Sequence, residues 1–252
     1  MDKSSTARRG ASKQALRERV WALLTRRRLG RFPLPLDDRI PNFAGADEAA
    51  ERLAATPEWR EARVLKCNPD APQRPVRLRA LREGKEVYVA VPRLAAARCF
   101  LRLDPRRLGA GRLAAAATIG GAAALGVAVA PRELPRIDLV VAGSVAVNRR
   151  GARVGKGGGY SDLEFALAAE LGAVDARTTI ATTVHDLQVL SAAIPMTAHD
   201  VPVDLIATPT RVLHARRVFA RPRRIRWTEL DATQLAAMPP LATLRAERGA
   251  RE

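Results

Sequence analysis

Apolar residues recur every three or four positions near the start of the chain, which is the spacing of a helix with one buried face. Ser12 precedes this stretch and is a favourable helix N-cap, and Gly30 follows it. On such a helix Lys13 and Arg17 lie about one turn apart and share a face. The pattern therefore predicts a first helix that presents two cations on one side.

Farther along, short apolar runs without polar alternation are separated by segments of helical pattern. The predicted strands are Arg63–Cys67, Val87–Val91, Ile137–Val147, Thr178–Val184 and Val203–Ala207, and the predicted helices are Asp47–Ala55, Val76–Glu83, Asp162–Leu171 and Ala232–Met238. Such strands are typical of a mostly parallel sheet that helices cover on both faces. We expect one Rossmann-like α/β domain over residues 12–240, a disordered basic leader at 1–11 and a polar C-terminal tail at 241–252.

Two segments interrupt this alternation. Residues 32–43 carry three prolines and predict an extended, stiff connection. Residues 113–130 carry no charge, but alanine and glycine dominate them and transfer poorly into lipid. We expect an alanine-rich helix followed by a short strand there, and no membrane association.

The chain is strongly basic, with a net charge of +17 over 252 residues. Basic residues concentrate at both ends: ten of them against two acids in residues 1–31, and seven arginines without an acid in residues 211–226. Such charge attracts polyanions, although 38 of the 43 basic residues are arginine, which also fits a general compositional bias. The two cysteines, Cys67 and Cys99, form no CxxC pair, and the N-terminus lacks a secretory pattern, so we expect a reducing, cytoplasmic location.

The stretch RVGKGGGYSD (residues 153–162) places four glycines around Lys156, between a predicted strand and a predicted helix. Consecutive glycines let backbone N–H groups converge on an anion, and a helix N-terminus adds to that preference. Lys156 suits phosphate, Tyr160 suits a planar ligand, and Asp162 suits Mg²⁺. The loop matches neither the Walker A nor the dinucleotide-binding fingerprint, so a purely structural turn is the alternative.

Several segments resemble the 5-formyltetrahydrofolate cyclo-ligase (methenyltetrahydrofolate synthetase) family in the family's own order. They are SKQALR, REGKEVYVAVP, GSVAVNRRGARVGKGGGYSD and HDVPVDLIATPT, within a resemblance that spans residues 11–240. The segments FPLPLDDRIPNFAGADEAAERL, KCNPDAPQ, VHDLQV and TPTRV resemble the methenyltetrahydrofolate synthetase domain-containing subgroup. Animal members of that subgroup carry an added RNA-recognition domain, which we do not expect in this chain.

The resemblance implies a layered α/β fold like that of sugar-phosphate isomerases and CoA transferases. It also implies a reaction that uses ATP and Mg²⁺, in which the formyl oxygen of 5-formyltetrahydrofolate is phosphorylated. The second folate nitrogen then attacks and closes 5,10-methenyltetrahydrofolate. Phosphoryl transfer depends on positioning and charge neutralisation, which a glycine loop with a lysine can supply.

The resemblance also implies roles for individual residues. Lys13 and Arg17 would hold ATP phosphates, together with a cradle of Arg153, Gly155, Lys156, Gly157, Gly158, Gly159, Tyr160 and Ser161, in which Lys156 and Tyr160 would be catalytic. Asp162 and Asp200 would bind Mg²⁺, and Leu65 and Asp70 would contact the folate. Structural alternatives are a solvated helix face for the first two cations, a helix cap for Asp162 and a turn cap for Asp200.

Four positions depart from the family pattern. Asn148 stands where the family has Asp, Ser161 replaces a second tyrosine, Asp70 is shorter than the usual Glu, and residues 122–125 lack a Glu. The phosphate side is thus matched more fully than the folate side. A non-catalytic nucleotide- or RNA-binding module on the same fold is the alternative to an enzyme.

Overall fold

The computed structural model describes residues 12–249, so the leader predicted at 1–11 and residues 250–252 lie outside the described part. Its centre is an eight-stranded sheet with the order β13-β12-β10-β7-β3-β4-β5-β6. The parallel strands are β3 (Val64–Cys67), β4 (Glu86–Ala90), β7 (Leu139–Val141), β10 (Thr179–Thr183) and β12 (Leu205–Ala207). Antiparallel strands β13 (Val212–His214), β5 (Phe100–Leu103) and β6 (Val127–Val129) complete it. The predicted fold class, a mostly parallel sheet flanked by helices, is confirmed.

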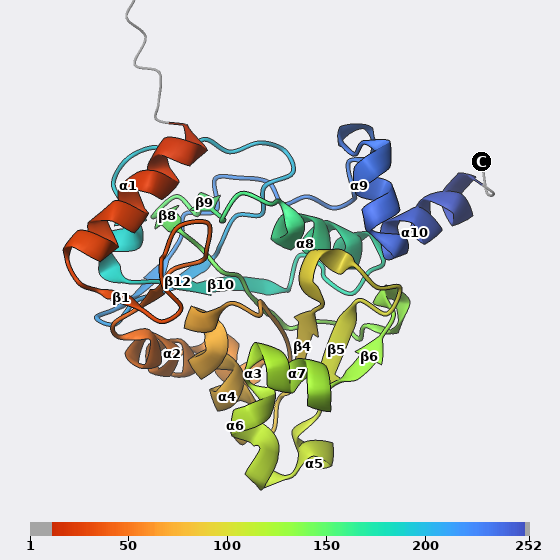
Figure 1. The fold of residues 1–252 in the computed structure, drawn as a ribbon, viewed down its shortest axis with the longest axis horizontal. Coiled ribbons are helices and arrows are strands. Elements are labelled where there is room, and N and C mark those ends of the chain that lie inside the picture. Colours follow the sequence, from red (N-terminus) through yellow and green to blue (C-terminus); the bar gives the residue numbers. More distant parts are fainter. Residues whose placement is uncertain (1–11, 250–252) are drawn as a thin grey trace, which may run out of the picture.

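Helices cover both faces of this sheet, because alternate strand residues point to opposite sides. One face packs against α2 (Ala46–Ala54), α3 (Pro57–Glu61), α4 (Arg74–Arg82), α6 (Leu113–Ala116) and α7 (Ile119–Leu125), with the short α5 (Pro105–Leu108) beside them (Figure 1). The other face packs against α8 (Tyr160–Glu170) and the C-terminal helices α9 (Ala232–Ala237) and α10 (Pro239–Gly249). In β7, Leu139 and Val141 join the first core and Val140 joins the second.

A smaller layer lies above the second face (Figure 1). It consists of α1 (Lys13–Arg26) and a three-stranded sheet of β11 (Val189–Leu190), β8 (Ala146–Asn148) and β9 (Arg153–Val154). The apolar face of α1, which includes Leu16, Val20 and Leu24, packs against this sheet, as the helical spacing predicts. The proline-rich connection is flanked by β1 (Gly30–Arg31) and β2 (Asn42–Phe43), which pair antiparallel.

The continuous strand predicted over Ile137–Val147 is wrong. The chain leaves the large sheet after Val141 and enters the small sheet at Ala146. Gly143 lies in the break, where a Cβ would stand 2.8 Å from Asp70 Oδ2 and 3.0 Å from Ile40 Cγ1. The apolar pattern could not reveal this break, because both halves are buried.

Two further segments differ in detail from the prediction. The alanine-rich stretch forms two short helices separated at Thr118, which caps the second by accepting from the Gly121 N–H, and then the expected strand. Helix α10 extends into the polar tail expected at 241–252, and Leu241 is fully buried against the core. No helix within residues 12–249 is long and apolar enough to span a bilayer.

Candidate functional site

A cavity of about 640 Å³ opens at the carboxyl ends of β3, β4 and β7. Parallel α/β sheets bind their ligands at this edge. The lining includes every residue predicted for the site except Leu65, namely Lys13, Arg17, Asp70, Arg153, Gly155, Lys156, Gly157, Gly158, Gly159, Tyr160, Ser161, Asp162 and Asp200. The fold therefore brings together residues that lie almost 190 positions apart in the chain.

Leu65 does not line this cavity. Its side chain is fully buried in the apolar core between the sheet and the helices of the first face. The next residue of β3, Lys66, forms an ion pair with Glu164 of α8, on the opposite face, since strand residues alternate. A direct contact between Leu65 and a ligand in the cavity is thus not possible in this arrangement.

The glycine loop joins β9 to α8 along one wall of the cavity. Gly157 and Gly159 have φ angles of +121° and +69°, in the region that favours glycine, and Gly159 is the N-cap of α8. Within residues 12–249 the N–H groups of residues 156–159 donate to no protein acceptor. Four consecutive N–H groups beside a helix N-terminus can hold an anion.

The cation and the ring of the loop are positioned differently. Lys156 is half exposed, and its Nζ lies 3.7 Å from Asp70 Oδ1 across the cavity. Tyr160 lies close over Gly158, where a Cβ would come within 2.9 Å of the ring. The Lys156 ammonium therefore lies in the cavity beside a single carboxylate at the long end of ion-pair distances, and the absence of a side chain at Gly158 leaves room for Tyr160.

Helix α1 brings its two predicted cations to the loop. Lys13 Nζ lies 2.5 and 2.6 Å from the two carboxylate oxygens of Asp200. Arg17 donates from Nε to the carbonyl oxygen of Gly155 at 2.7 Å, and burial lowers the pKa of its guanidinium. The shared face predicted for Lys13 and Arg17 therefore faces the cavity and not solvent.

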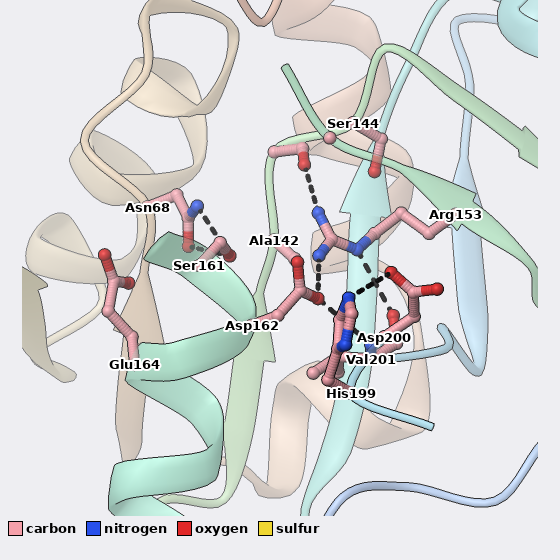
Figure 2. Close-up of polar contacts among 12 residues, drawn as sticks. Asn68, Ala142, Ser144, Arg153, Ser161, Asp162, Glu164, His199, Asp200 and Val201 are labelled. Atoms are coloured by element: carbon pink, nitrogen blue, oxygen red, sulfur yellow. Dashed lines mark hydrogen bonds and ion pairs between the residues drawn. The ribbon is translucent and has the colours of Figure 1, made fainter. Parts of the chain in front are cut away.

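Arg153 is a buried hub beneath the loop, as Figure 2 shows. It donates to the Gly143 carbonyl at 2.8 Å, to the Val201 carbonyl at 3.2 Å and to Asp162 Oδ1 at 2.5 Å. Asp162 lies in the first turn of α8 rather than at the cap, and its Oδ1 also accepts from the Val201 N–H at 3.0 Å. Arg153 thereby joins the break between the sheets, α8 and the segment that carries Asp200.

The two predicted Mg²⁺ ligands differ in how many of their carboxylate oxygens already accept hydrogen bonds. Asp162 Oδ2 receives no hydrogen bond from residues 12–249. Both oxygens of Asp200 are held by Lys13, and Oδ2 also accepts from the N–H and hydroxyl of Thr197. Burial would raise the pKa of Asp200, but these donors hold it below the ordinary value. Among residues 12–249, no three His, Cys, Asp or Glu side chains are grouped so that they could hold a metal ion.

A buried polar network at the floor of the cavity was not predicted from the sequence. Glu164 of α8 lines the cavity and forms an ion pair with Lys66, whose Nζ also donates to Asn68 Oδ1 at 2.8 Å. Asn68 in turn donates to Ser161 Oγ at 3.0 Å (Figure 2). Burial raises the pKa of the Glu164 carboxyl, and the Lys66 ammonium opposes this. The one sequence signal was a lysine inside an apolar strand, since such a charge needs a buried partner.

The departures from the family pattern fall into separate places. Ser161 and Asp70 line the cavity. Buried Arg77 fixes the loop that carries Asp70 by donating to the Asn68 and Asp70 carbonyls. Asn148 lies outside the lining, where its Oδ1 accepts from the N–H groups of Arg150 and Ala152 and shapes the turn before β9. Of α7, only Ile119 lines the cavity.

Fold and site together define an α/β protein with a glycine-loop cavity at the carboxyl edge of its sheet. The chain belongs to the 5-formyltetrahydrofolate cyclo-ligase family, whose sequence profile matches residues 9–209. It is 40% identical over 243 residues to the methenyltetrahydrofolate synthase domain-containing protein of Bos taurus, and 37% identical over 242 residues to that of Homo sapiens. Each match covers 94% of this chain but only 63% and 62% of the relative, so the chain spans less than two thirds of their length.

A solved structure supports the fold independently. The NMR structure of 5,10-methenyltetrahydrofolate synthetase from Aquifex aeolicus aligns with a TM-score of 0.51 at 21% identity. The alignment covers 82% of this chain and 95% of that structure. At this identity the likeness establishes a shared fold, and the chemistry must be argued from the cavity itself.

Proposed function

We propose that this protein is an ATP- and Mg²⁺-dependent 5-formyltetrahydrofolate cyclo-ligase. The observation that carries the proposal is the glycine loop, whose four consecutive N–H groups are unpartnered within residues 12–249 and lie in one cavity with Lys13, Arg17 and Lys156. A triphosphate carries the charge and the acceptor oxygens that such a cradle requires.

Each cation has a separate task in this reaction. Lys156, which is half exposed, reaches the transferred phosphoryl group and offsets the charge that spreads over its oxygens. Lys13 holds a phosphate once it exchanges Asp200 for the ligand, while Arg17 keeps α1 against the loop through Gly155. The formyl oxygen attacks the terminal phosphorus, ADP leaves, and the second folate nitrogen then displaces phosphate as the ring closes.

Mg²⁺ in such reactions usually takes one or two carboxylates, phosphate oxygens and water, and it neutralises charge on the phosphates. Asp162 fits this requirement, because its Oδ2 accepts no hydrogen bond within residues 12–249. Asp200 fits only after Lys13 has moved to a phosphate, since Lys13 holds both carboxylate oxygens. When a phosphate binds Lys13, the Lys13–Asp200 pair separates, and the Asp200 carboxylate becomes available to Mg²⁺.

The side of the cavity away from the glycine loop is lined by both polar and apolar side chains. Asp70, Asn68 and Glu164 offer acceptors for the N–H groups of a pterin-like ring, and Ile40 and Ile119 lie in the same lining. Tyr160 lies between this side and the glycine loop and can stack on a planar ring. The reduced folate would therefore place its formyl group toward Lys156.

The test is a direct assay for methenyltetrahydrofolate formation from 5-formyltetrahydrofolate, ATP and Mg²⁺, followed by absorbance. Lys156→Ala should lower ATP affinity at least about tenfold, because a charge-assisted contact is lost. Arg82→Ala, which removes an exposed cation outside this cavity, is the control and should leave affinity unchanged. Unchanged ATP binding in Lys156→Ala would refute the phosphate cradle, and ATP binding without turnover would reduce the proposal to a nucleotide-binding module.

A further inference from the structure

A second hollow, of about 840 Å³, lies between residues 221–228 and helix α10. Six of its eleven lining residues are arginines, and none is acidic. With 38 arginines among 252 residues, composition alone would place between one and two arginines in a set of eleven. We name this feature the arginine hollow, defined by Arg221, Arg223, Arg224, Arg226, Arg245 and Arg248.

Internal ion pairs account for only part of this charge. Arg221 bonds to Asp204 and to the Thr178 carbonyl, and Arg226 bonds to Glu229. These acids are not part of the lining, so they anchor the arginines from behind. In contrast, Arg223, Arg224 and Arg245 are exposed and form no ion pair with any residue of 12–249.

The fold offsets the charge of the hollow only in part. Arg248 also has a partner, Glu170 at 3.9 Å, but Arg223, Arg224 and Arg245 line the same hollow without an ion pair from residues 12–249, so like charges repel one another there. A bound polyanion would remove this repulsion and would release counterions. The arginines come from two segments, residues 221–226 and α10, so more than one phosphate of a chain can find a guanidinium partner there.

Trp227 adds an aromatic ring to the same lining. It is half-buried, whereas Trp21 and Trp59 are buried at 3% and 1% exposure. Sites for single-stranded nucleic acid combine a positive groove with aromatic rings on which bases stack. The last part of the basic run at residues 211–226 therefore lies beside the aromatic ring of Trp227.

We infer that the arginine hollow is a binding site for a phosphate chain, namely the backbone of single-stranded nucleic acid, with Trp227 stacking on a base. None of its residues lines the glycine-loop cavity, so the inference does not rest on the proposed enzymatic function. A free polyphosphate offers the same phosphate groups without bases. An experiment that compares the two can therefore distinguish nucleic acid from polyphosphate as the ligand.

The experiment is a titration of the full chain with an oligouridine decamer at several salt concentrations around 0.15 M, read by tryptophan fluorescence. Tripolyphosphate, matched in phosphate concentration, forms the second arm. We expect the decamer to quench Trp227 fluorescence and to bind at least about tenfold more tightly than tripolyphosphate, because stacking contributes about 1–3 kcal/mol per base. A Trp227→Phe variant should retain part of the affinity and lose the quenching.

Two matched triple variants separate a site from general basicity. Arg223→Ala/Arg224→Ala/Arg245→Ala removes three charges from the hollow, and Arg82→Ala/Arg107→Ala/Arg112→Ala removes three exposed charges outside it. We expect the first to weaken decamer binding at least about tenfold and to reduce the salt slope by about two, and the second to change affinity less than about threefold. Circular dichroism spectra and urea midpoints like those of the wild type would show that both variants are folded.

Three results would overturn the inference. Equal loss in the two triple variants would assign binding to overall charge, and no decamer binding near 0.15 M salt would leave the hollow without this ligand. Equal affinity for tripolyphosphate and the decamer would reject nucleic acid as the source of the phosphates.

Discussion

Lys13 and Asp200 lie 187 positions apart and meet in one ion pair, in which Nζ is 2.5 and 2.6 Å from the two carboxylate oxygens. In the proposed function, Lys13 must leave this pair before it can hold a phosphate. We therefore expect Asp200→Asn to increase ATP affinity about threefold to tenfold in the presence of EDTA. Calorimetry with ATP measures this directly, and unchanged affinity in EDTA would show that Lys13 does not bind phosphate.

The same variant, measured with Mg²⁺, tests the metal role that the family resemblance implies for Asp200. If Asp200 is a ligand, Asp200→Asn should reduce the extra ATP affinity that Mg²⁺ confers. Asp162→Asn is the comparison, because Asp162 Oδ2 accepts no hydrogen bond within residues 12–249. Loss of the Mg²⁺ effect in the Asp162 variant alone would leave Asp162 as the single carboxylate ligand.

The backbone of the glycine loop should be as sensitive as its lysine. At Gly157 the φ angle of +121° disfavours any side chain, so Gly157→Ala should cost roughly 1–3 kcal/mol locally and should weaken ATP binding about tenfold. Gly111→Ala is the matched control, because an added Cβ would meet no atom within 4 Å there and the φ angle is ordinary. Calorimetry and urea denaturation of both variants check the prediction, which fails if the two behave alike.

Arg153 should matter chiefly for stability. Arg153→Met leaves Asp162 without its buried cation and should lower the free energy of unfolding by about 3–5 kcal/mol. Arg98→Met breaks the exposed pair with Glu133 and should cost about 1 kcal/mol or less. Urea unfolding of the two variants makes the comparison, and Arg153→Met/Asp162→Asn should recover part of the loss. Equal small losses would contradict the role of Arg153 as a hub.

The Lys13–Asp200 pair also predicts a dependence on pH. The pKa of Asp200 lies below its ordinary value of 3.8, so the pair stabilises the fold above that pH and this contribution is lost as pH falls through the lower, folded-state pKa. The difference in unfolding free energy between the wild type and Asp200→Asn should be constant near pH 5–7 and should shrink below about pH 4. A difference that stays constant down to pH 2 would contradict the lowered pKa.

The glycine loop and the cations of α1 could be predicted from the sequence because each depends on local pattern. The loop needs glycine at consecutive positions, and Lys13 and Arg17 share a face through helical spacing alone. The partners of these groups could not be predicted in this way. Lys66 and Glu164 lie 98 positions apart, and only the packing of α8 against the sheet brings them together.

The errors in the sequence analysis have equally specific causes. The resemblance implies a ligand contact for Leu65. Side chains alternate along a strand, however, and that of Leu65 points into the core on the face opposite to Lys66. The pattern of Ile137–Val147 predicts one strand, because buried strands of two different sheets have the same apolar pattern. The composition of residues 241–252 predicts a polar tail, although Leu241 and Leu244 of α10 pack against the core.

The segment that carries Asp200 separates the arginine hollow from the glycine-loop cavity. Ala198 lines the arginine hollow, and the adjacent His199 and Asp200 line the glycine-loop cavity. His199 Nδ1 lies 2.7 Å from Glu229 Oε2, and Glu229 also pairs with Arg226 of the hollow. An anion that drew Arg226 away from Glu229 would also change the surroundings of His199, next to Asp200. Because binding free energies are reciprocal, any change that nucleic acid caused in ATP affinity through this segment would equal the change that ATP caused in nucleic-acid affinity.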